Sequence, residues 1–442
     1  MNMSVNRFSK VLCAAVILFA GASVYAQDGA YTGFTPYSIF GLGDINTPGS
    51  AYNKGMGGVG IATRNRRYLN YLNPAAVTAR DSLSVLADMS LSEGNRIMSQ
   101  GDMKSANNTF NVNNSAISFP ITRNSAIMFG IAPFSSVGYD YQYLLNDDTI
   151  VGNTGHAAYV AAGKGSIYKT FASAGVTLFK RLSLGVEGDL YFGAIDKESE
   201  FTFAKSAYSG INNGYTISLK GTSAKFGLQY EQPLGSKTSV IVGATYSLGS
   251  NFGGYVDEYR IASGTSQNDT LSFVRDTLGV NADKIRIPSE IGLGLSINHS
   301  DTWRAEFNYT RSDWTTSGLD RANGFSIAGS SSFTTRLSET YRAGFEIVPN
   351  RNDIRYFYKR CAYRAGVYYD KSYFAVDGNQ VKDIGMTLGA SIPVFRYFNS
   401  VTFAVSMGQR ASMVGNMIRE RYVNFTFGFN FADQWFFKPT YK

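Results

Sequence analysis

The chain has 442 residues, a formal net charge of +8, 44% hydrophobic residues and 14% aromatic residues. The Lys and Arg residues are scattered and follow no nucleic-acid-binding motif, which argues against a nucleic-acid partner. No segment beyond the N-terminus approaches the 18 apolar residues of a membrane-spanning helix. The composition, with 46 Gly, 29 Tyr, 31 Phe and only 10 Pro, favours pleated strands and tight turns.

The first 26 residues have the features of a secretory signal peptide. Arg7 and Lys10 form a basic region, the apolar run VLCAAVILFAGAS follows, and the small residues of VYA precede Gln27. We therefore expect cleavage near Ala26, and residues 1–26 take no part in the mature fold. Cys361 is then the one remaining cysteine, so an internal disulfide is excluded and a small apolar packing role is expected.

Residues 27–81 are Gly-rich and show no clear period. Three of their glycines fit the G-x-G-x-x-G spacing, but neither a buried strand before them nor a helix after them is apparent, so no nucleotide site is expected. Dense glycine instead permits close backbone packing in a confined space such as a barrel lumen. The segment ends in Asn73-Pro74-Ala75, where Pro74 disfavours helix at Asn73 and removes one backbone donor. An ordinary loop proline is the alternative interpretation.

From residue 82 to residue 431 the apolar residues alternate. In 182–192, LSLGVEGDLYF, one face is a continuous apolar stripe and the other carries small and acidic residues. Segments of about 9–12 residues with this pattern are typical of a transmembrane β-barrel. A soluble sandwich is the alternative, but it would place longer polar side chains on the second face.

The pattern indicates about fourteen antiparallel strands, which must close because an open edge would leave backbone groups unsatisfied in lipid. Short and long connections alternate, as in barrels of the bacterial outer membrane. We expect the last strand at 417–431 and a periplasmic tail at 432–442. The longer, external connections are expected at 92–111, 138–165, 196–214, 252–284 and 313–332.

Charged residues fall on the inward face of these strands by alternation. They belong either to a solvated wall or to a network that holds residues 27–81 in the lumen. Arg64, Arg66 and Arg67 of that segment are the expected partners of wall acids such as Glu187, Asp189 and Glu306. The inward set comprises Glu187, Asp189, Glu231, Glu290, Glu306, Glu346, Lys225, Arg304, Arg342 and Arg364.

Three stretches carry a family resemblance: Asn73-Pro74-Ala75; residues 287–314, which end at Trp314; and residues 341–372, which repeat Arg-Ala-Gly. With them, most of the mature chain resembles the FadL/TodX family of outer-membrane transporters for fatty acids and aromatic hydrocarbons. The resemblance implies a fourteen-stranded barrel with residues 27–81 as a hatch in its lumen. It also implies passive uptake of a hydrophobic small molecule by a monomer without cofactor.

The polar loops at 138–165 and 252–284 depart from the apolar external loops of those transporters. Some Bacteroidota members of the family are instead partners of a protein-secretion machine, and the Tyr- and Asn-rich composition suits that group. A non-transporting barrel with protein partners at its external loops is therefore the alternative function.

Enzyme activity is not expected. His299 lies directly beside Ser300 and Asp301, and three neighbours cannot converge as a catalytic triad. His156 lies in an expected external loop without a predictable partner. No Cys/His cluster has metal-ligand spacing, so neither a metal nor a catalytic residue is predicted. The expected surroundings are outer-membrane lipid.

Overall fold

The computed structural model describes residues 31–81, 84–145, 148–205, 208–263, 268–326, 331–394, 399–414 and 417–434. The expected signal peptide and its cleavage site lie outside these residues. Among the described helices, none has the length and apolar character needed to cross a membrane.

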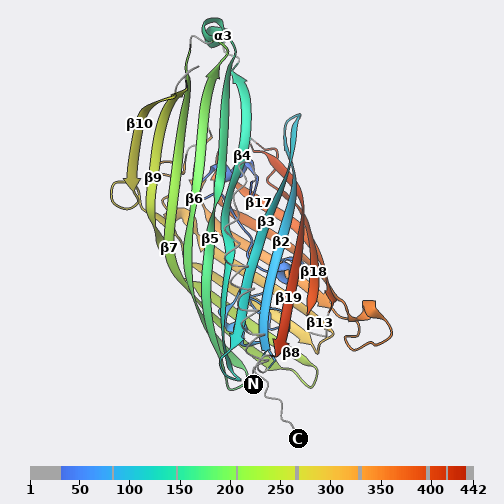
Figure 1. Ribbon diagram of the computed structural model, residues 1–442. Helices are drawn as coiled ribbons and strands as arrows, with labels where there is room; N and C mark the ends of the chain where they lie inside the picture. Colours follow the sequence, from blue (N-terminus) through green and yellow to red (C-terminus); the bar gives the residue numbers. More distant parts are fainter. Residues whose placement is uncertain are drawn as a thin grey trace, which may run out of the picture. The chain divides into compact units, whose positions relative to one another are not determined.

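Antiparallel strands follow one another around a closed wall (Figure 1). The last strand pairs with the first, from Gln434 opposite Ser84 to Arg419 opposite Ser99, which closes the ring. The wall strands are β2 (Ser84–Gln100), β3 (Met103–Pro120), β4 (Ser125–Leu145), β5 (Ala157–Leu178), β6 (Leu182–Phe203), β7 (Gly210–Pro233), β8 (Thr238–Ser247), β9 (Ser250–Ser263), β10 (Asn268–Thr277), β11 (Ile285–Ile287), β12 (Glu290–His299), β13 (Trp303–Asp313), β14 (Phe333–Thr335), β15 (Leu337–Ile347), β16 (Ala362–Val376), β17 (Asn379–Pro393), β18 (Ser400–Arg410) and β19 (Arg419–Gln434).

Three positions of the wall are interrupted along the chain. β8 and β9 pair with different parts of β7. At the next position of the wall, β10 pairs with β9 and β12 pairs with β8, and the short β11 lies between them in the chain. At a third position the short β14, which pairs with β16, comes directly before β15. In the described residues the barrel therefore has fourteen strands, which confirms the predicted fold class. β19 passes Phe431 and ends at Gln434, beyond the predicted end of the last strand. Residues 435–442, most of the predicted tail, lie outside the described part.

The other elements are short. Four belong to the segment before the wall: η1 (Pro36–Ile39), β1 (Asp44–Ile45), α2 (Ala51–Lys54) and η2 (Pro74–Thr78). Three lie in connections between wall strands: α3 (Asp148–Thr154), η3 (Trp314–Thr316) and η4 (Phe357–Arg360).

The wall exposes its apolar face and buries its polar face. On β12, Leu293 is 50% exposed whereas Ser296 is fully buried. On β6, Leu190 is exposed while Glu187 and Asp189 are buried. A water-soluble sandwich would have the opposite arrangement, so the apolar outer face is the lipid-facing surface of a membrane barrel.

Strands β5, β6 and β7 have 22, 22 and 24 residues, and they correct the predicted loops. Most of 92–111, 138–165, 196–214 and 252–284 continues the strands beyond the apolar band. The apolar stripe stops where the strands leave the membrane, so the pattern that defines a membrane strand ends before the hydrogen-bonded strand does. Of the predicted long loops, 313–332 keeps its irregular form between β13 and β14 in its described residues.

The prolonged strands form one tall side of the barrel, which we call the upper sheet: 135–145 of β4, 157–165 of β5, 194–203 of β6, 210–218 of β7, 254–263 of β9, and β10 (Figure 1). Glycines with a positive φ lie at its base. Gly193 has a φ of 158°, and a Cβ there would lie 2.1 Å from the carbonyl oxygen of Ser166 on β5. Gly254 on β9 has a φ of 129° and approaches the carbonyl oxygen of Ser218 in the same way. Glycine permits these close backbone approaches.

The opposite end of the barrel has the tight turns 121–124, 179–181, 234–237 and 300–302, and we call it the short-turn end. The connection 348–361, which contains η4, is longer than these. β2 begins and β19 ends at the short-turn end, because their terminal residues pair there.

Candidate functional site: the barrel lumen

Residues 32–80, which we call the N-terminal segment, contact the inward face of strands around the wall. At the upper level, β1 pairs with β4 through Asp44 opposite Ser136. The segment thereby covers β4 where β4 no longer pairs with β3, since that pairing runs only between Ser115–Pro120 and Ala126–Ile131 in the described residues. The segment therefore completes the wall at this level from within.

Asn73-Pro74-Ala75 lies in a recess made by a row of glycines. Gly185 on β6 pairs with Gly175 on β5 and with Gly227 on β7. A Cβ at Gly185 would lie 2.3 Å from the carbonyl carbon of Pro74, and one at Gly227 would lie 2.1 Å from Oδ1 of Asn73. Only glycine lets the step approach the wall this closely.

Asn73 shapes the step with both ends of its side chain. Its Oδ1 accepts from the N–H of Ala75 at 3.0 Å and caps η2, while its Nδ2 donates to the carbonyl of Ile61 at 2.8 Å. Pro74 takes the first position of η2, where its missing N–H costs nothing. Residues 73–75 thus form a capped turn against the wall, from which the chain leads to β2.

The Gly-rich stretch 51–62 meets further glycines of the wall in order. Each wall glycine in the set faces backbone or a small side chain of the segment, at distances that a Cβ would not permit. The facing pairs are Gly428 with Ala51, Gly389 with Gly55, Gly366 with Gly57, Gly344 with Met56, and Gly243 and Gly294 with Ile61 and Ala62.

Glu306 on β13 is the wall acid that binds the backbone of the segment directly. It accepts from the N–H of Ala62 at 3.0 Å and from the hydroxyl of Thr63 at 2.5 Å. Beside it, the amide oxygen of Asn308, when turned toward the segment, accepts from the N–H groups of Gly60 and Ile61 at 2.8 and 3.1 Å. These acceptors satisfy the backbone donors of a stretch that has no regular secondary structure.

Arg64 is the member of the arginine group that is held by the wall. Its guanidinium donates to Ser183 at 2.8 Å and to Gln229 at 3.1 Å, and it lies 3.7 Å from Glu231. Gln229 also donates to the carbonyl of Ile61 at 2.9 Å. The anionic partner of Arg64 is therefore Glu231 and not the acids expected from the sequence.

Arg66 and Arg67 lie nearer the short-turn end. The Arg66 side chain is 77% exposed and lies 3.7 Å from Asp81, within the same stretch of chain. The backbone carbonyl of Arg67 accepts from Nδ2 of Asn430 on β19 at 2.7 Å. The side chain of Arg67 lines a small cavity together with Arg351 and Arg360.

Glu187 and Asp189 are occupied within the wall. Lys169 on β5 lies 3.0 Å from a carboxylate oxygen of each, and Ser173 donates to Glu187 at 2.7 Å. Sequence alternation places these acids on the inward face, but it does not identify Lys169, which comes from the neighbouring strand and pairs with both of them.

A second group joins Arg304 and Arg364 to the aromatic residues of the segment. Arg304 donates to the hydroxyl of Tyr52 at 3.0 Å and to the carbonyl of Arg64 at 2.9 Å. Arg364 lies 2.6 Å from Glu346, and its guanidinium lies over the rings of Tyr52 and Tyr68 at 4.1 and 5.0 Å from their centres. Stacking and ion pairing together fix α2 against β13 and β16.

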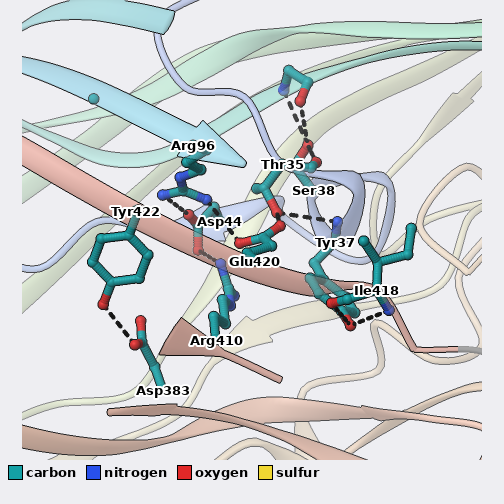
Figure 2. Close-up of polar contacts among 12 residues, drawn as sticks. Thr35, Tyr37, Ser38, Asp44, Arg96, Asp383, Arg410, Ile418, Glu420 and Tyr422 are labelled. Carbon is teal, nitrogen blue, oxygen red and sulfur yellow. Dashed lines mark hydrogen bonds and ion pairs between the residues drawn. The ribbon is translucent and has the colours of Figure 1, made fainter. Parts of the chain in front are cut away.

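Asp44 is the centre of the ion-pair group in Figure 2. Arg410 on β18 and Arg96 on β2 lie 2.8 and 3.4 Å from its carboxylate. Burial alone would raise the pKa of Asp44, but the two guanidinium groups hold it below its usual value. Arg96 also lies 3.2 Å from Glu420, which accepts from the hydroxyl of Thr35.

Alternation within the predicted strands did not reveal this group, although it contained part of the signal. Arg410 continues the polar face of β18, and Glu420 continues that of β19, so alternation extended to the strand ends would have found both. Asp44 has no such signal, because it stands in an irregular Gly-rich stretch.

The upper lumen is packed with apolar side chains. Phe40 of the segment stacks on Phe333 with ring centres 5.3 Å apart, and Phe325 is fully buried. Trp314, which carries the family resemblance, is buried in η3 with its ring 4.8 Å from that of Tyr373. Residues 314–326 also contact the segment, since the N–H of Gly41 donates to the carbonyl of Phe325 at 2.8 Å.

The lumen also contains a cavity of about 380 Å³. Its lining combines apolar residues such as Ile61 and Leu72 with charged and polar ones, among which Arg342 is paired with Asp370 at 2.7 Å and Tyr422 donates to Asp383 at 2.6 Å. Lys54 also lines it, and burial together with the nearby Arg342 lowers the pKa of this lysine to about 8. In the described part of the chain no group of His, Cys, Asp and Glu side chains could hold a metal ion.

A closed wall with an apolar outer face and a polar lumen defines an outer-membrane β-barrel, and solved structures of this class share its fold. CymD, a monoaromatic hydrocarbon channel, is 14% identical with a TM-score of 0.57, over 88% of this chain and 98% of that one. A FadL homologue of Pseudomonas aeruginosa is 10% identical with a TM-score of 0.58, over 90% and 99%. The P. putida toluene transporter TodX is 13% identical with a TM-score of 0.58, over 87% and 98%.

The sequence itself matches the family model described as BamG over residues 8–442. The chain therefore belongs to the BamG family, and its barrel has the FadL-like fold. No curated protein matches it in sequence.

Proposed function

We propose that this barrel is a protein partner in secretion or assembly at the outer membrane, with the upper sheet outside the cell as its docking surface. This is the second of the two functions considered from the sequence. Passive uptake of a hydrophobic molecule needs a continuous apolar path, whereas ion pairs and hydroxyl groups interrupt the apolar residues that line the cavity of the lumen. Moving an apolar ligand across such a lining would require breaking those pairs.

The length of the strands supports an external surface. A strand of 22 residues spans roughly 73 Å at 3.3 Å per residue, and a tilt of about 40° leaves roughly 55 Å along the barrel axis. The apolar band of an outer-membrane barrel is about 25 Å tall. More than half of such a strand therefore lies outside the membrane. The extension is confined to the side of the wall that carries the upper sheet.

The observation that carries the proposal is the edge strand β10. It pairs with β9, and Figure 1 draws it at the margin of the upper sheet. Leu271, Phe273 and Val274 on it are all exposed. An exposed apolar edge with backbone donors and acceptors is suited to the addition of a partner's strand.

Site-specific photo-crosslinking in intact outer membranes tests the proposal. A photoreactive amino acid at Phe273 should give discrete crosslinked proteins that mass spectrometry identifies. The control position is Leu234, an equally exposed apolar residue in a tight turn at the short-turn end. The variant carrying Leu271→Asp and Val274→Asp should lose the crosslinks at Phe273.

Absence of any protein adduct at Phe273, together with a hydrophobic small molecule that co-purifies with the barrel in detergent, would instead favour uptake.

A further inference from the structure

The connection 348–361, which is longer than the other turns at the short-turn end, is held by hydrogen bonds within it. The N–H of Asn350 donates to the carbonyl of Lys359 at 2.9 Å and closes the loop across its base. Asp353 accepts from the N–H groups of Arg355 and Tyr356 at 2.9 and 2.6 Å and orders the tip before η4. The residues on either side of the closed base, Arg351 and Arg360, are thereby held next to each other.

These two arginines meet Arg67 of the N-terminal segment around a cavity of about 30 Å³. Tyr68, Ser391 and Ser400 also line this cavity, and among the described residues no Asp or Glu does. By volume the cavity has room for roughly two waters, which is the scale of a single anionic group and not of a whole lipid.

Three donor atoms of residues that line the cavity lack a partner among the described residues. Nε of Arg351, Nε of Arg360 and Oγ of Ser400 are buried and have no hydrogen-bond partner in the described chain. Buried donors of this kind are costly and usually find a ligand, ion or water. Burial and the neighbouring Arg351 lower the pKa of Arg67, whereas Asp301 and Asp81 act in the opposite direction.

We propose that Arg67, Arg351 and Arg360 bind a phosphate group at the short-turn end of the barrel. Guanidinium groups match the oxygens of phosphate in geometry and charge, and three of them exceed what one carboxylate would need. This binding site is independent of the docking surface proposed at the upper sheet.

The loop beside the cavity indicates how a phosphate group attached to a lipid could be accommodated. Ile354 is 94% exposed, and Phe357 and Tyr358 are also exposed. The carbonyl of Tyr358 accepts from the hydroxyl of Tyr363, a residue on the exposed outer face of β16, at 3.0 Å. The loop thus folds toward the lipid-facing surface, where aromatic and cationic residues commonly contact headgroups. Free phosphate in solution has the same chemistry, and the experiment separates the two sources.

The experiment uses the full-length protein in detergent, folded as judged by heat-modifiable mobility in electrophoresis. Isothermal titration with inorganic phosphate at about 0.15 M salt forms one arm, because this salt screens diffuse attraction. Native mass spectrometry after addition of short-chain phosphatidylglycerol forms the other. The variants are Arg351→Gln and Arg360→Gln, and the matched control is Arg355→Gln, an exposed arginine of the same loop that stacks on Tyr356 and does not line the cavity.

We expect saturable binding of one phosphate group per barrel, weakened by about tenfold in each of Arg351→Gln and Arg360→Gln and unchanged in Arg355→Gln. Binding in the lipid arm alone identifies a headgroup, and binding in both arms identifies phosphate as such. Equal weakening by Arg355→Gln would show a diffuse basic surface and overturn the proposal. So would the absence of binding in both arms with a folded wild-type barrel.

Discussion

At the scale of single residues, Arg64 and Arg66 differ sharply although they are two positions apart. Arg64 is 13% exposed in its side chain and donates to wall groups on β6 and β7, whereas Arg66 is mostly exposed. Arg64→Gln should loosen the N-terminal segment, because it removes charged hydrogen bonds worth about 1.5–3 kcal/mol each when partly buried. Arg66→Gln should have little effect, since exposed pairs contribute about 0–1 kcal/mol.

Limited proteolysis of the purified barrel and single-channel conductance are the measurements. Faster cleavage within 32–80 and larger conductance are expected for Arg64→Gln alone. Similar behaviour of the two variants would mean that the ring of wall contacts around Arg64 does not hold the segment.

Lys54 provides a test by pH. Its pKa falls from 10.5 to about 8 on folding, so the unfolded chain binds the proton more tightly than the folded one. The cost of burying the charged lysine is fully present below pH 8 and disappears as the pH rises toward 10.5. This group therefore makes the barrel more stable with rising pH in that window.

Lys54→Met should raise the unfolding temperature below pH 8 and flatten its increase toward pH 10.5, as read from heat-modifiable mobility. Lys180→Met, at an exposed lysine in a tight turn, is the control and should change neither. If the unfolding temperature of the wild type fell between pH 8 and pH 10.5, and that of the Lys54→Met variant fell in parallel, the lowered pKa of Lys54 would be contradicted.

The inward position of residues such as Glu306, Arg304 and Arg364 follows from strand alternation and could be predicted. Their partners could not, because the contact between the N-terminal segment and the wall depends on how an irregular chain crosses the lumen. Lys54 shows the limit clearly: in the sequence it stands in a short polar stretch, and only the fold places it against Arg342 in a cavity.

At the scale of elements, the row of glycines on β5, β6 and β7 lets residues 73–75 lie directly against the wall. Gly185→Val should displace Asn73-Pro74, because even a Cβ at this position would overlap the Pro74 backbone. Gly188→Val on the same strand is the matched control, since a Cβ there has no neighbour within 4 Å and points outward.

Protease cleavage of the segment in folded barrels distinguishes the two. Cleavage should accelerate in Gly185→Val and stay at the wild-type rate in Gly188→Val. If both variants resist cleavage equally, the wall can move aside and the recess is not required.

The two faces of β19 can be compared at adjacent residues. Phe425 is exposed on the lipid-facing side, and Asn424 lines the cavity of the lumen. Phe425→Arg should destabilise the barrel by about 2–4 kcal/mol near the membrane midplane, and Asn424→Arg should cost less because the cavity contains charged and polar side chains and offers room. Denaturant unfolding in lipid vesicles measures both, and equal losses would count against the assignment of the faces.

The number and order of the strands were predictable because the apolar stripe recurs in every wall strand. The length of β4 to β7 was not, because outside the lipid both faces of a strand tolerate polar residues and the period disappears. The positive φ values of Gly193 and Gly254 had no distinctive sequence signal either, since both glycines stand among many others.

At the scale of the whole molecule, the wall and the N-terminal segment are held by different interactions. The wall closes through backbone pairing between β19 and β2, which does not involve residues 32–80. The segment is held by side chains of the wall and by the pairing of β1 with β4. The wall should therefore form without the segment, although the reverse is not expected.

Deletion of residues 32–72 tests this division and the role of the segment as a hatch. The barrel should still reach the membrane and show heat-modifiable mobility, since the pairing between wall strands does not involve the segment and only β4 loses a paired strand, β1. The wall groups that lose partners, such as Glu306 and Arg304, would face water in the opened lumen and be solvated there, which limits the cost. Conductance and sensitivity to a large hydrophilic antibiotic should then rise well above the values for Arg64→Gln. Wild-type conductance in a folded deletion variant would mean that the segment does not occlude the lumen. Loss of the folded barrel would show that β4, without β1 beside it, cannot hold its part of the wall.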